Sequence, residues 1–314
     1  METHNTTSPM QFILLGFLHH TNEHTFFLAL IWLALVTAVS GNTLLLVLIQ
    51  VDSSLHTPMY FFLGQLAFMD MCQTLTVVPK MSADFLTPGN RISPVGCGVQ
   101  IFLSLTMGGA ECLLLAVMAY DRYVAICNPL QYPILLSRRA CMGLAAGVWI
   151  GAAADALMHS VYTMHLPYCG SKDIEQFFCE IQSLLKLSCS DTSQYETLVI
   201  VIAIVVLLMP ASIILASYTR ILSMVPRMKS TKGKQKARAT CSSHLTVVGL
   251  FYGSGVFMYM KPNDPHSPEQ DKIAPVFYII VTPVLNPLIY SLRNRDVLGA
   301  LRKLVGKYRV LQQN

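Results

Sequence analysis

The residues of this chain that could carry chemistry are the charged side chains that lie inside long apolar runs. Only 12% of the 314 residues are charged, yet Asp121 and Arg122 lie side by side in MAYDRYVAIC, at the end of one such run. Three further acids, Asp70, Glu111 and Asp155, also lie within apolar runs. Charges are costly in an apolar environment, so such residues usually face an interior and have a partner. The chemistry these types support is ion pairing, cation binding through carboxylate oxygens, and proton sharing between neighbouring carboxylates.

A catalytic function finds no support in the motifs. The chain contains no G-x-S-x-G, no H-E-x-x-H and no P-loop, and its nine histidines are scattered without metal-ligand spacing. Asp155 and His159 are four residues apart and share a helical face. We expect them to pair with each other; a ligand or metal contact is the alternative. The sequence therefore predicts that the protein is not an enzyme and requires no cofactor.

The apolar runs themselves are the elements that must position these charges. The chain is 53% hydrophobic, with a mean hydropathy of +0.50, which is typical of a membrane protein. A bilayer-spanning helix needs about 20 apolar residues, and seven stretches are long enough: 26–50, 58–79, 97–120, 140–165, 197–222, 239–260 and 273–292. We predict an all-α membrane protein, a seven-transmembrane helix bundle with a short amphipathic C-terminal helix.

The distribution of lysine and arginine predicts the orientation. Cytoplasmic segments carry the excess of basic residues. With the N-terminus outside, the outer segments hold only six of the 22 basic residues: Lys80, Arg91, Lys172, Lys186, Lys261 and Lys272. The basic runs then indicate topology and contacts with anionic lipid, not a nucleic-acid site.

This orientation divides the chain into three parts. Residues 1–25 form an extracellular N-terminus, 26–292 form the transmembrane domain, and 293–314 form a cytoplasmic amphipathic helix and tail. Within the domain we expect a long extracellular loop at 166–195 and a basic intracellular loop at 226–238. Asn5, in the N-x-[ST] match NTT, is predicted to be glycosylated because it falls on the outer side.

Four of the nine cysteines fall in predicted outer segments: Cys97, Cys169, Cys179 and Cys189. An oxidising outer face favours disulfides, and four cysteines allow three sets of pairings. Two disulfides would hold the 166–195 loop as a lid over the bundle. The other five cysteines are expected to be small buried hydrophobic residues.

Four motifs in order along the chain carry a family resemblance: PMYFFLGQLAFMD (58–70), MAYDRYVAIC (118–127), KARATCSSHL (236–245) and PVLNPLIYSLRN (283–294). Together they resemble an odorant receptor of the rhodopsin-like G-protein-coupled receptors. The resemblance implies the disulfides Cys97–Cys179 and Cys169–Cys189. It also implies a volatile odorant as ligand, a heterotrimeric stimulatory olfactory-type G protein that raises cyclic AMP as partner, and the plasma membrane of olfactory sensory neuron cilia as location.

Other functions for the same architecture were weighed. A chemoreceptor of the same fold that is expressed outside the nose and reads a metabolite remains an alternative. A transporter is less favoured, because paired repeats with broken helices are absent from the sequence. A retinal-binding protein would need a lysine in the last span, and 273–292 contains none.

The resemblance also implies a switch at the inner end of the bundle. Asp121 steadies Arg122 until the outward swing of the 239–260 helix frees the arginine to meet the G protein. The other residues implied in coupling or switching are Tyr123, Tyr218, His244, Asn286, Pro287 and Tyr290.

Two departures from the family pattern affect this switch. No Asp or Glu lies between Arg227 and His244, so the acidic lock at the base of the 239–260 helix is missing. His244 either restrains that end instead or is a core histidine. The same helix lacks a proline, and its glycines could supply bending.

The resemblance places a ligand pocket and an ion site in the bundle. The pocket candidates are Ser104, Leu105, Gly108, Gly109, Cys112, Ile202, Val206, Tyr252, Gly255, Tyr259 and Ile279. None is charged, so a small, neutral, mostly apolar ligand is expected. Asp70, Glu111 and Asn286, with Asn42 nearby, either hold a sodium ion or form a polar network that shares a proton.

Overall fold

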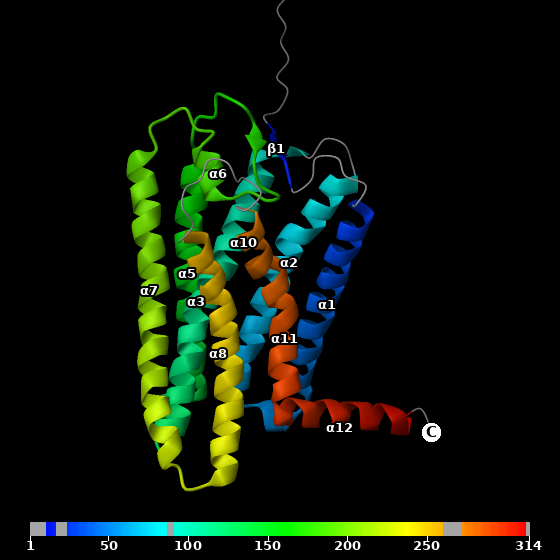
Figure 1. Cartoon of the computed structure of the whole chain (residues 1–314), viewed down its shortest axis with the longest axis vertical. Helices are drawn as coiled ribbons and strands as arrows, with labels where there is room; N and C mark the ends of the chain where they lie inside the picture. Colours follow the sequence, from blue (N-terminus) through cyan, green and yellow to red (C-terminus); the bar gives the residue numbers. More distant parts are fainter. Residues whose placement is uncertain (1–10, 17–23, 87–90, 260–271, 312–314) are drawn as a thin grey trace, which may run out of the picture.

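The computed structural model describes residues 11–16, 24–86, 91–259 and 272–311, and every structural statement concerns these residues. Asn5 lies outside them. Helices dominate the described chain, and seven helical segments run along one bundle (Figure 1). The first six are α1 (His24–Val51), α2 (Pro58–Leu86), α3 (Pro94–Cys127), α5 (Arg138–Met164), α7 (Ser193–Met224) and α8 (Thr231–Tyr259). The seventh is composite: α10 (Ile273–Val276), the π-helical turn η3 (Phe277–Val281) and α11 (Thr282–Arg293).

The two ends of the bundle differ. One end, the strand end, carries three short strands: β1 (Phe12–Leu14), β2 (Arg91–Ile92) and β3 (Asp173–Ile174). At the other end, the α12 end, helix α12 (Arg295–Leu311) lies across the bundle (Figure 1). Short helical turns complete the chain: η1 (Ser53–Leu55), α4 (Tyr132–Leu135), α6 (Ile181–Leu185) and η2 (Val225–Arg227). The fold class predicted from sequence is confirmed.

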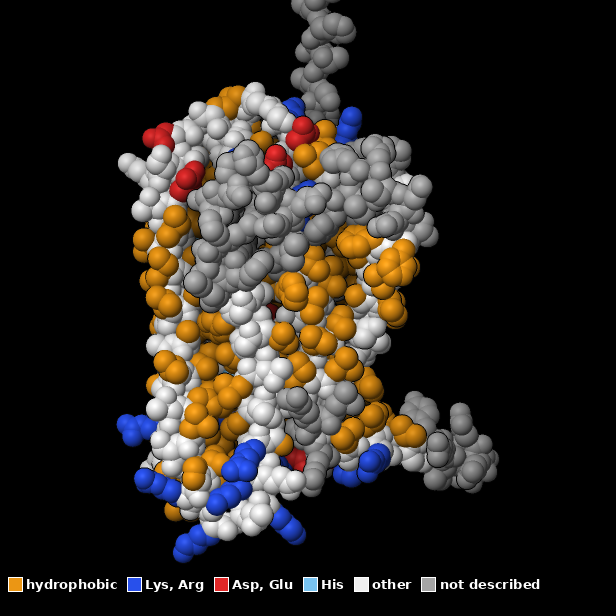
Figure 2. Space-filling view, viewed as in Figure 1, with side chains coloured by type: hydrophobic (Ala, Val, Ile, Leu, Met, Phe, Trp, Pro, Cys, Tyr) orange, Lys and Arg blue, Asp and Glu red, His pale blue; other side chains and the backbone are white. Residues whose placement is uncertain are grey.

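The surface of the bundle is that of a membrane protein. Five of the described helices are long and apolar enough to cross a bilayer, and Phe277–Tyr290 is a shorter apolar helical stretch. Large apolar side chains face outward, such as Leu215 at 70% exposed and Ile150 at 69%. Apolar side chains cover much of the visible flank, while acids gather at the strand end and basic residues at the α12 end (Figure 2). The protein is therefore a multi-pass membrane protein, with lipid as the solvent of its flank.

Helix α3 is the central element of the bundle. It packs against α2, α5, α7 and α8. Its start is defined locally, because the Ser93 hydroxyl accepts a hydrogen bond from the Gly96 N–H at 3.0 Å and Pro94 occupies the first turn. Its 34 residues rise about 51 Å at about 1.5 Å per residue. One helix therefore carries residues for a site at each end of the bundle and in its middle.

Prolines explain why the seventh segment is not one regular helix. Proline has no N–H for the carbonyl four residues earlier, so Pro283 and Pro287 leave the carbonyls of Ile279 and Pro283 without their usual donors. The Thr74 hydroxyl donates to Ile279 O at 3.3 Å, and the Asn42 side-chain amide donates to Pro283 O at 3.0 Å. Neighbouring helices thus satisfy the freed backbone, as the absence of water in lipid requires.

The basic segment 226–238, expected as a loop, is mostly helical. Helix α7 runs to Met224, η2 continues to Arg227, and α8 already begins at Thr231. Lysine, glutamine, alanine and arginine, which make up most of 232–238, are all good helix formers. The Ser230 hydroxyl also accepts a hydrogen bond from the Gly233 N–H at 3.2 Å and caps the start of α8. The sequence prediction gave weight to the charge of this segment and overlooked its helix propensity.

A small sheet closes the strand end. Strand β1 lies in the middle, antiparallel to β2 and parallel to β3. The chain preceding α1 thereby joins the α2–α3 connection to the lid between α5 and α7. Phe12 and Leu14 of β1 are buried in an apolar cluster with the lid residue Ile174.

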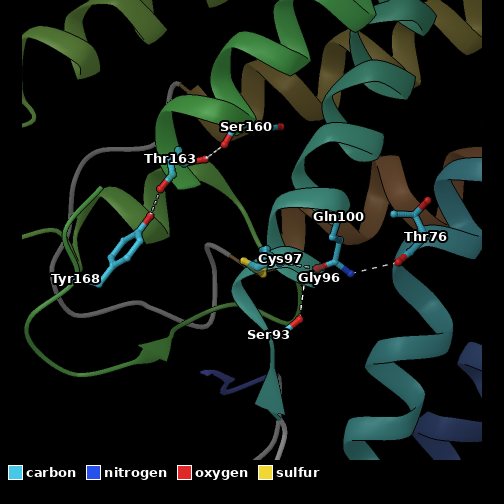
Figure 3. Close-up of a disulfide and its surroundings, with 9 residues drawn as sticks. Thr76, Ser93, Gly96, Cys97, Gln100, Ser160, Thr163 and Tyr168 are labelled. Atoms are coloured by element: carbon cyan, nitrogen blue, oxygen red, sulfur yellow. Dashed lines mark hydrogen bonds between the residues drawn. A yellow bond between two sulfur atoms is a disulfide. The ribbon is translucent and has the colours of Figure 1, made fainter. Parts of the chain in front are cut away.

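Two disulfides hold the lid, and they are the pairs that the resemblance implies. Cys97 of α3 is bonded to Cys179, and Cys169 is bonded to Cys189 within the lid. Gln100 lies about one turn further along α3 than Cys97 (Figure 3). Its side-chain oxygen accepts from the Cys179 N–H at 2.8 Å, and its amide nitrogen donates to Thr76 O at 3.2 Å. The lid is therefore anchored to both α3 and α2.

Candidate functional site

A cavity of about 290 Å³ lies beneath the lid. Its walls come from α3, α5, α7 and α8, with Tyr278 of η3 and residues 178–182 of the lid. Eight of the predicted pocket residues line it: Ser104, Leu105, Gly108, Gly109, Cys112, Ile202, Val206 and Gly255. The volume is near the lower end of the range for ligand pockets, about 300–1,000 Å³, so the cavity suits a small molecule.

The two adjacent glycines of α3, Gly108 and Gly109, have different surroundings. A side chain at Gly108 would meet no atom within 4 Å, so the missing side chain is cavity space. At Gly109 a side chain would stand 3.5 Å from the Ala152 Cβ. Gly109 therefore lies at the contact between α3 and α5, where a Cβ would make an ordinary van der Waals contact, while Gly108 adds room for a ligand.

A proline and a cysteine shape the floor of the cavity. Pro210 lies inside α7 and removes the donor for Val206 O. The Cys112 thiol donates to that carbonyl at 3.2 Å and lies 3.3 Å from the Tyr252 hydroxyl oxygen. Cys112 thus satisfies backbone of α7 and joins α3 to α8 directly below the ligand space.

The α5 side of the cavity is polar. Asp155 and His159 both line it, with the Asp155 Oδ1 3.5 Å from the His159 Nε2. The other ring nitrogen of His159, Nδ1, lies 2.7 Å from the Tyr195 hydroxyl oxygen. The expected pairing of Asp155 with His159 is present, and the pair also faces the cavity.

A buried polar group occupies the middle of the bundle. Asn286 donates from its side-chain amide to both Asp70 carboxylate oxygens, at 3.1 and 2.9 Å. Asp70 is 1% exposed and Glu111 6% exposed. Four buried oxygens here have no hydrogen-bond partner among the described residues: Asn42 Oδ1, Glu111 Oε1, Asn286 Oδ1 and Tyr290 OH.

These oxygens fit a hard cation chemically. Sodium takes carboxylate, amide and hydroxyl oxygens, and a buried oxygen left without a partner costs about 1–3 kcal/mol. They also fit water molecules or a proton held between the carboxylates of Asp70 and Glu111. The described residues show no preformed cluster of three or more His, Cys, Asp or Glu that could hold a metal.

The Asp121–Arg122 pair lies near the α12 end of α3. Arg122 Nη2 bonds Asp121 Oδ2, and the second Asp121 oxygen accepts from the Tyr132 hydroxyl of α4 at 2.8 Å. Burial, and then the Asp121 charge, raises the pKa of Tyr132, which keeps its hydroxyl a donor. Arg122 also borders a small cavity of about 20 Å³ together with His244 and Tyr290.

His244 connects three helices at this level. Its Nδ1 lies 2.8 Å from the Tyr218 hydroxyl oxygen of α7, and its Nε2 lies 3.2 Å from Leu115 O of α3. A carbonyl can only accept, so Nε2 carries the proton, and Nδ1 accepts from Tyr218 in the neutral imidazole. The geometry ties the lower part of α8 to α3 and α7.

An ion pair lies at the base of α8, where the acidic lock is missing. Lys236 Nζ is 2.7 Å from Asp296 Oδ2 in the first turn of α12. The Tyr60 hydroxyl of α2 donates to the same Asp296 oxygen at 3.3 Å. The base of α8 is therefore held by a basic residue of its own and an acid of α12.

Comparison with known proteins decides the family. The olfactory receptor family model matches residues 28–307. Human olfactory receptor 2T11 is 52% identical over 298 residues, covering 95% of this chain and 94% of the relative. Human olfactory receptors 2AG2 and 2AG1 are 52% and 53% identical, each over 98% or more of both chains. The chain belongs to the olfactory receptor family.

Membership decides the class of protein. The receptor is a rhodopsin-like G-protein-coupled receptor and not an enzyme. Odorants as ligands and a G protein as partner follow in general terms from the family. The resemblance identified from the four motifs is therefore confirmed.

The structure places some predicted residues away from the cavity. Tyr252 lies behind Cys112, and Ile279 is fully buried in a cluster with Phe177 and Phe178 of the lid. The side chain of Tyr259 lies outside the described residues. In the switch, Tyr123 contacts Tyr120 and Asn128 rather than the small cavity beside Arg122.

Other residues of the site were missed from the sequence. The polar members of the cavity wall that were not predicted to bind ligand are Asp155, His159, Glu180, Gln182, Ser254 and Tyr278. The sequence did point to Asp155, since an acid inside a membrane span is a candidate functional residue by default. Glu180 and Gln182 gave no signal of their own; they reach the cavity because the Cys97–Cys179 disulfide and the Gln100 hydrogen bond hold this part of the lid against α3.

Proposed function

We propose that the receptor binds small, neutral, mostly apolar volatile molecules in the cavity beneath the lid. The observation that carries this proposal is the cavity itself, walled by aliphatic residues of α7 and by the open face of Gly108. Apolar contacts supply affinity there, and the few polar groups orient the ligand. The lid, anchored through Cys179 and Gln100, contributes the wall of the cavity nearest the strand end.

The membrane orientation belongs to the same proposal. The strand end faces the outside and the α12 end faces the cytosol, in the plasma membrane of olfactory cilia. The clustering of basic residues at the α12 end supports this orientation (Figure 2). Asn5 would then be on the glycosylated side.

Signalling would run through the α12 end to a stimulatory, olfactory-type G protein that raises cyclic AMP. Arg122 is held by Asp121 in the resting state, and His244 holds α8 against α3 and α7. Outward movement of α8 would break the His244 contacts and open the small cavity beside Arg122 to the G protein. Pro287 and the irregular seventh segment would allow Tyr290 to move with it.

Asp70, Glu111 and Asn286 would hold a sodium ion in the middle of the bundle. The bound cation would supply positive charge between two carboxylates that otherwise repel each other. The oxygens without partners support this proposal, and a shared proton is the alternative. Replacing sodium by choline should lower ligand-free stability in the wild type and leave Glu111→Gln unchanged; equal behaviour of the two would favour the shared proton.

The test of the ligand site uses the space at Gly108. A Cβ at Gly108 would meet no atom within 4 Å, so Gly108→Leu projects into the cavity, and the bulkiest active odorants should lose about tenfold or more in potency while the smallest keep theirs. Gly147→Leu is the matched control, because Gly147 is an exposed α5 glycine with equally open surroundings. Cyclic AMP in cells with equal receptor surface density is the measurement.

A second variant separates binding from coupling. Arg122→Ala should reach the cell surface and remain silent towards every odorant that activates the wild type. Equal responses of Gly108→Leu and wild type to all ligand sizes would contradict the cavity. Full signalling by Arg122→Ala would contradict the coupling mechanism instead.

A further inference from the structure

The cavity is charged on one side only. Among the described residues, its lining includes two acids, Asp155 from α5 and Glu180 from the lid, and no lysine or arginine. The opposite wall is aliphatic and comes from α7, with Val199, Ile202 and Val206 among its members. A ligand that fits both walls has an apolar body and a head that is a cation or a strong hydrogen-bond donor.

His159, which lies beside Asp155, does not take up all of the hydrogen-bonding capacity of the Asp155 carboxylate. In the neutral imidazole, Nε2–H points to Asp155 at 3.5 Å while Nδ1 accepts from Tyr195 at 2.7 Å. The Tyr195 hydroxyl supplies the proton of its bond to Nδ1, and 3.5 Å is long for a hydrogen bond from Nε2, so the Asp155 oxygens keep the capacity to accept from a ligand. The Asp155 side chain keeps about a third of its surface, 32%, exposed, and that residue borders the cavity.

A second polar atom lies on the facing helix. The Ser104 hydroxyl of α3 borders the cavity and has no hydrogen-bond partner among the described residues, although the atom is buried. Such an atom is costly to leave unpaired, so it favours a ligand group that donates to it.

Ser104 and Asp155 lie at similar depth. Gly109 and Ala152 meet where α3 and α5 cross, with 3.5 Å between the built Cβ of Gly109 and that of Ala152. The two helices run in opposite directions. Ser104 therefore lies five residues nearer the strand end than Gly109, and Asp155 lies three residues nearer the strand end than Ala152. At about 1.5 Å per residue the two differ by about 3 Å in depth. Both residues therefore border the same cavity at about the same level.

We infer that Asp155 and Ser104 form a binding site for the ammonium head of an aliphatic amine, whose alkyl chain lies along α7. Aliphatic amines suit this site because they are volatile as neutral bases and protonated in neutral water, with a pKa near that of a lysine side chain, about 10.4. The inference rests on the cavity of the proposed function and changes one part of it: the apolar body of the ligand stays the same, but its head group is a cation rather than neutral. Neutral alcohols of equal length enter the same space and bind less tightly, since they bring no charge to Asp155.

The experiment compares three ligands of equal chain length: a primary alkylamine, the alcohol and the carboxylic acid. In the wild type the order of potency should be amine, then alcohol, with the anionic acid inactive. A charged hydrogen bond contributes enough for a preference of about 10- to 100-fold for the amine over the alcohol. This ranking needs no variant, so it tests the inference even if every substitution at Asp155 stays inside the cell.

Substitution then assigns the preference to Asp155. Asp155→Asn should lower the amine-to-alcohol potency ratio by about 10- to 100-fold, while the alcohol response stays within about twofold. Asp191→Asn is the matched control, because Asp191 is an exposed acid beside the start of α7 and does not line the cavity. Asp191→Asn should keep the wild-type ratio.

The outcomes distinguish this inference from the proposed function. A wild type that answers alcohols but not amines, or an unchanged ratio in Asp155→Asn, overturns the ammonium site and leaves the odorant cavity in place. A wild type at normal surface density that is silent towards every neutral and amine ligand of a broad panel contradicts the cavity itself, and the ammonium site with it.

Discussion

Asn42 donates a hydrogen bond from its side-chain amide to the carbonyl oxygen of Pro283 at 3.0 Å. The usual donor to that carbonyl is missing because Pro287 has no N–H. The same arrangement recurs where Thr74 donates to Ile279 O. Helices α1 and α2 therefore complete the backbone of the seventh segment, and its irregular shape depends on its neighbours.

Removing this donor should destabilise the receptor. Asn42→Leu leaves Pro283 O buried without its partner, at a cost of about 1–3 kcal/mol. A lower apparent melting temperature of the purified receptor in detergent is the expected result. Thr37→Val is the control, since Thr37 is only half-buried and its hydroxyl donates to Leu33 O within its own helix. Equal melting of both variants and the wild type would contradict the role of Asn42.

His244 should restrain the resting state. His244→Leu removes the contacts with Tyr218 and with Leu115 O, so α8 should separate from α3 more easily. We expect ligand-free cyclic AMP to rise several-fold at equal surface density. The control is His165→Leu, because His165 is exposed and its ring bonds Val161 O on the same helix. Unchanged basal signalling in His244→Leu would mean that this histidine only fills the core.

The Lys236–Asp296 pair should contribute a weaker restraint. Both side chains are partly exposed, at 67% and 38%, and exposed pairs contribute about 0.2–1 kcal/mol. Lys236→Glu should therefore raise basal signalling by no more than about fivefold, and the double exchange Lys236→Glu with Asp296→Lys should reverse part of the rise. Lys232→Glu, an exposed neighbour on α8, is the control. A double exchange that signals as strongly as the single one would rule out a direct pair.

Asp52 predicts a pH dependence at the α12 end. Hydrogen bonds from Ser54 and Lys303 lower the pKa of Asp52 from 3.8 to about 2. Because the pKa is lowered in the folded protein, the stabilisation from Asp52 is fully present above about pH 4 and is lost as the pH falls towards 2. The melting temperature of the wild type should exceed that of Asp52→Asn at pH 6, and the difference should shrink below pH 4. A difference that stays constant down to pH 2 would show that the charge of Asp52 is not the cause.

The sequence by itself determined the class of fold. Hydropathy is a local property, and in lipid each span must satisfy its backbone within itself, so apolar runs of sufficient length predict helices directly. The four motifs and the outer cysteines were equally visible in the linear chain. The same local reasoning failed at 226–238, where charge suggested a loop and helix propensity produced the start of α8.

The tertiary structure decided which distant groups meet. Sixty residues separate Lys236 from Asp296, and 241 separate Asn42 from Pro283, so no local pattern could pair them. The three strands are only two or three residues long, too short for an alternating pattern to show. Asp155 belongs to the cavity because the close contact of Gly109 with Ala152 sets the height of α5 against α3. Packing between helices, which depends on both partners at once, decided which intramembrane polar residues line the cavity beneath the lid, which form the polar group around Asp70, and which lie beside Arg122.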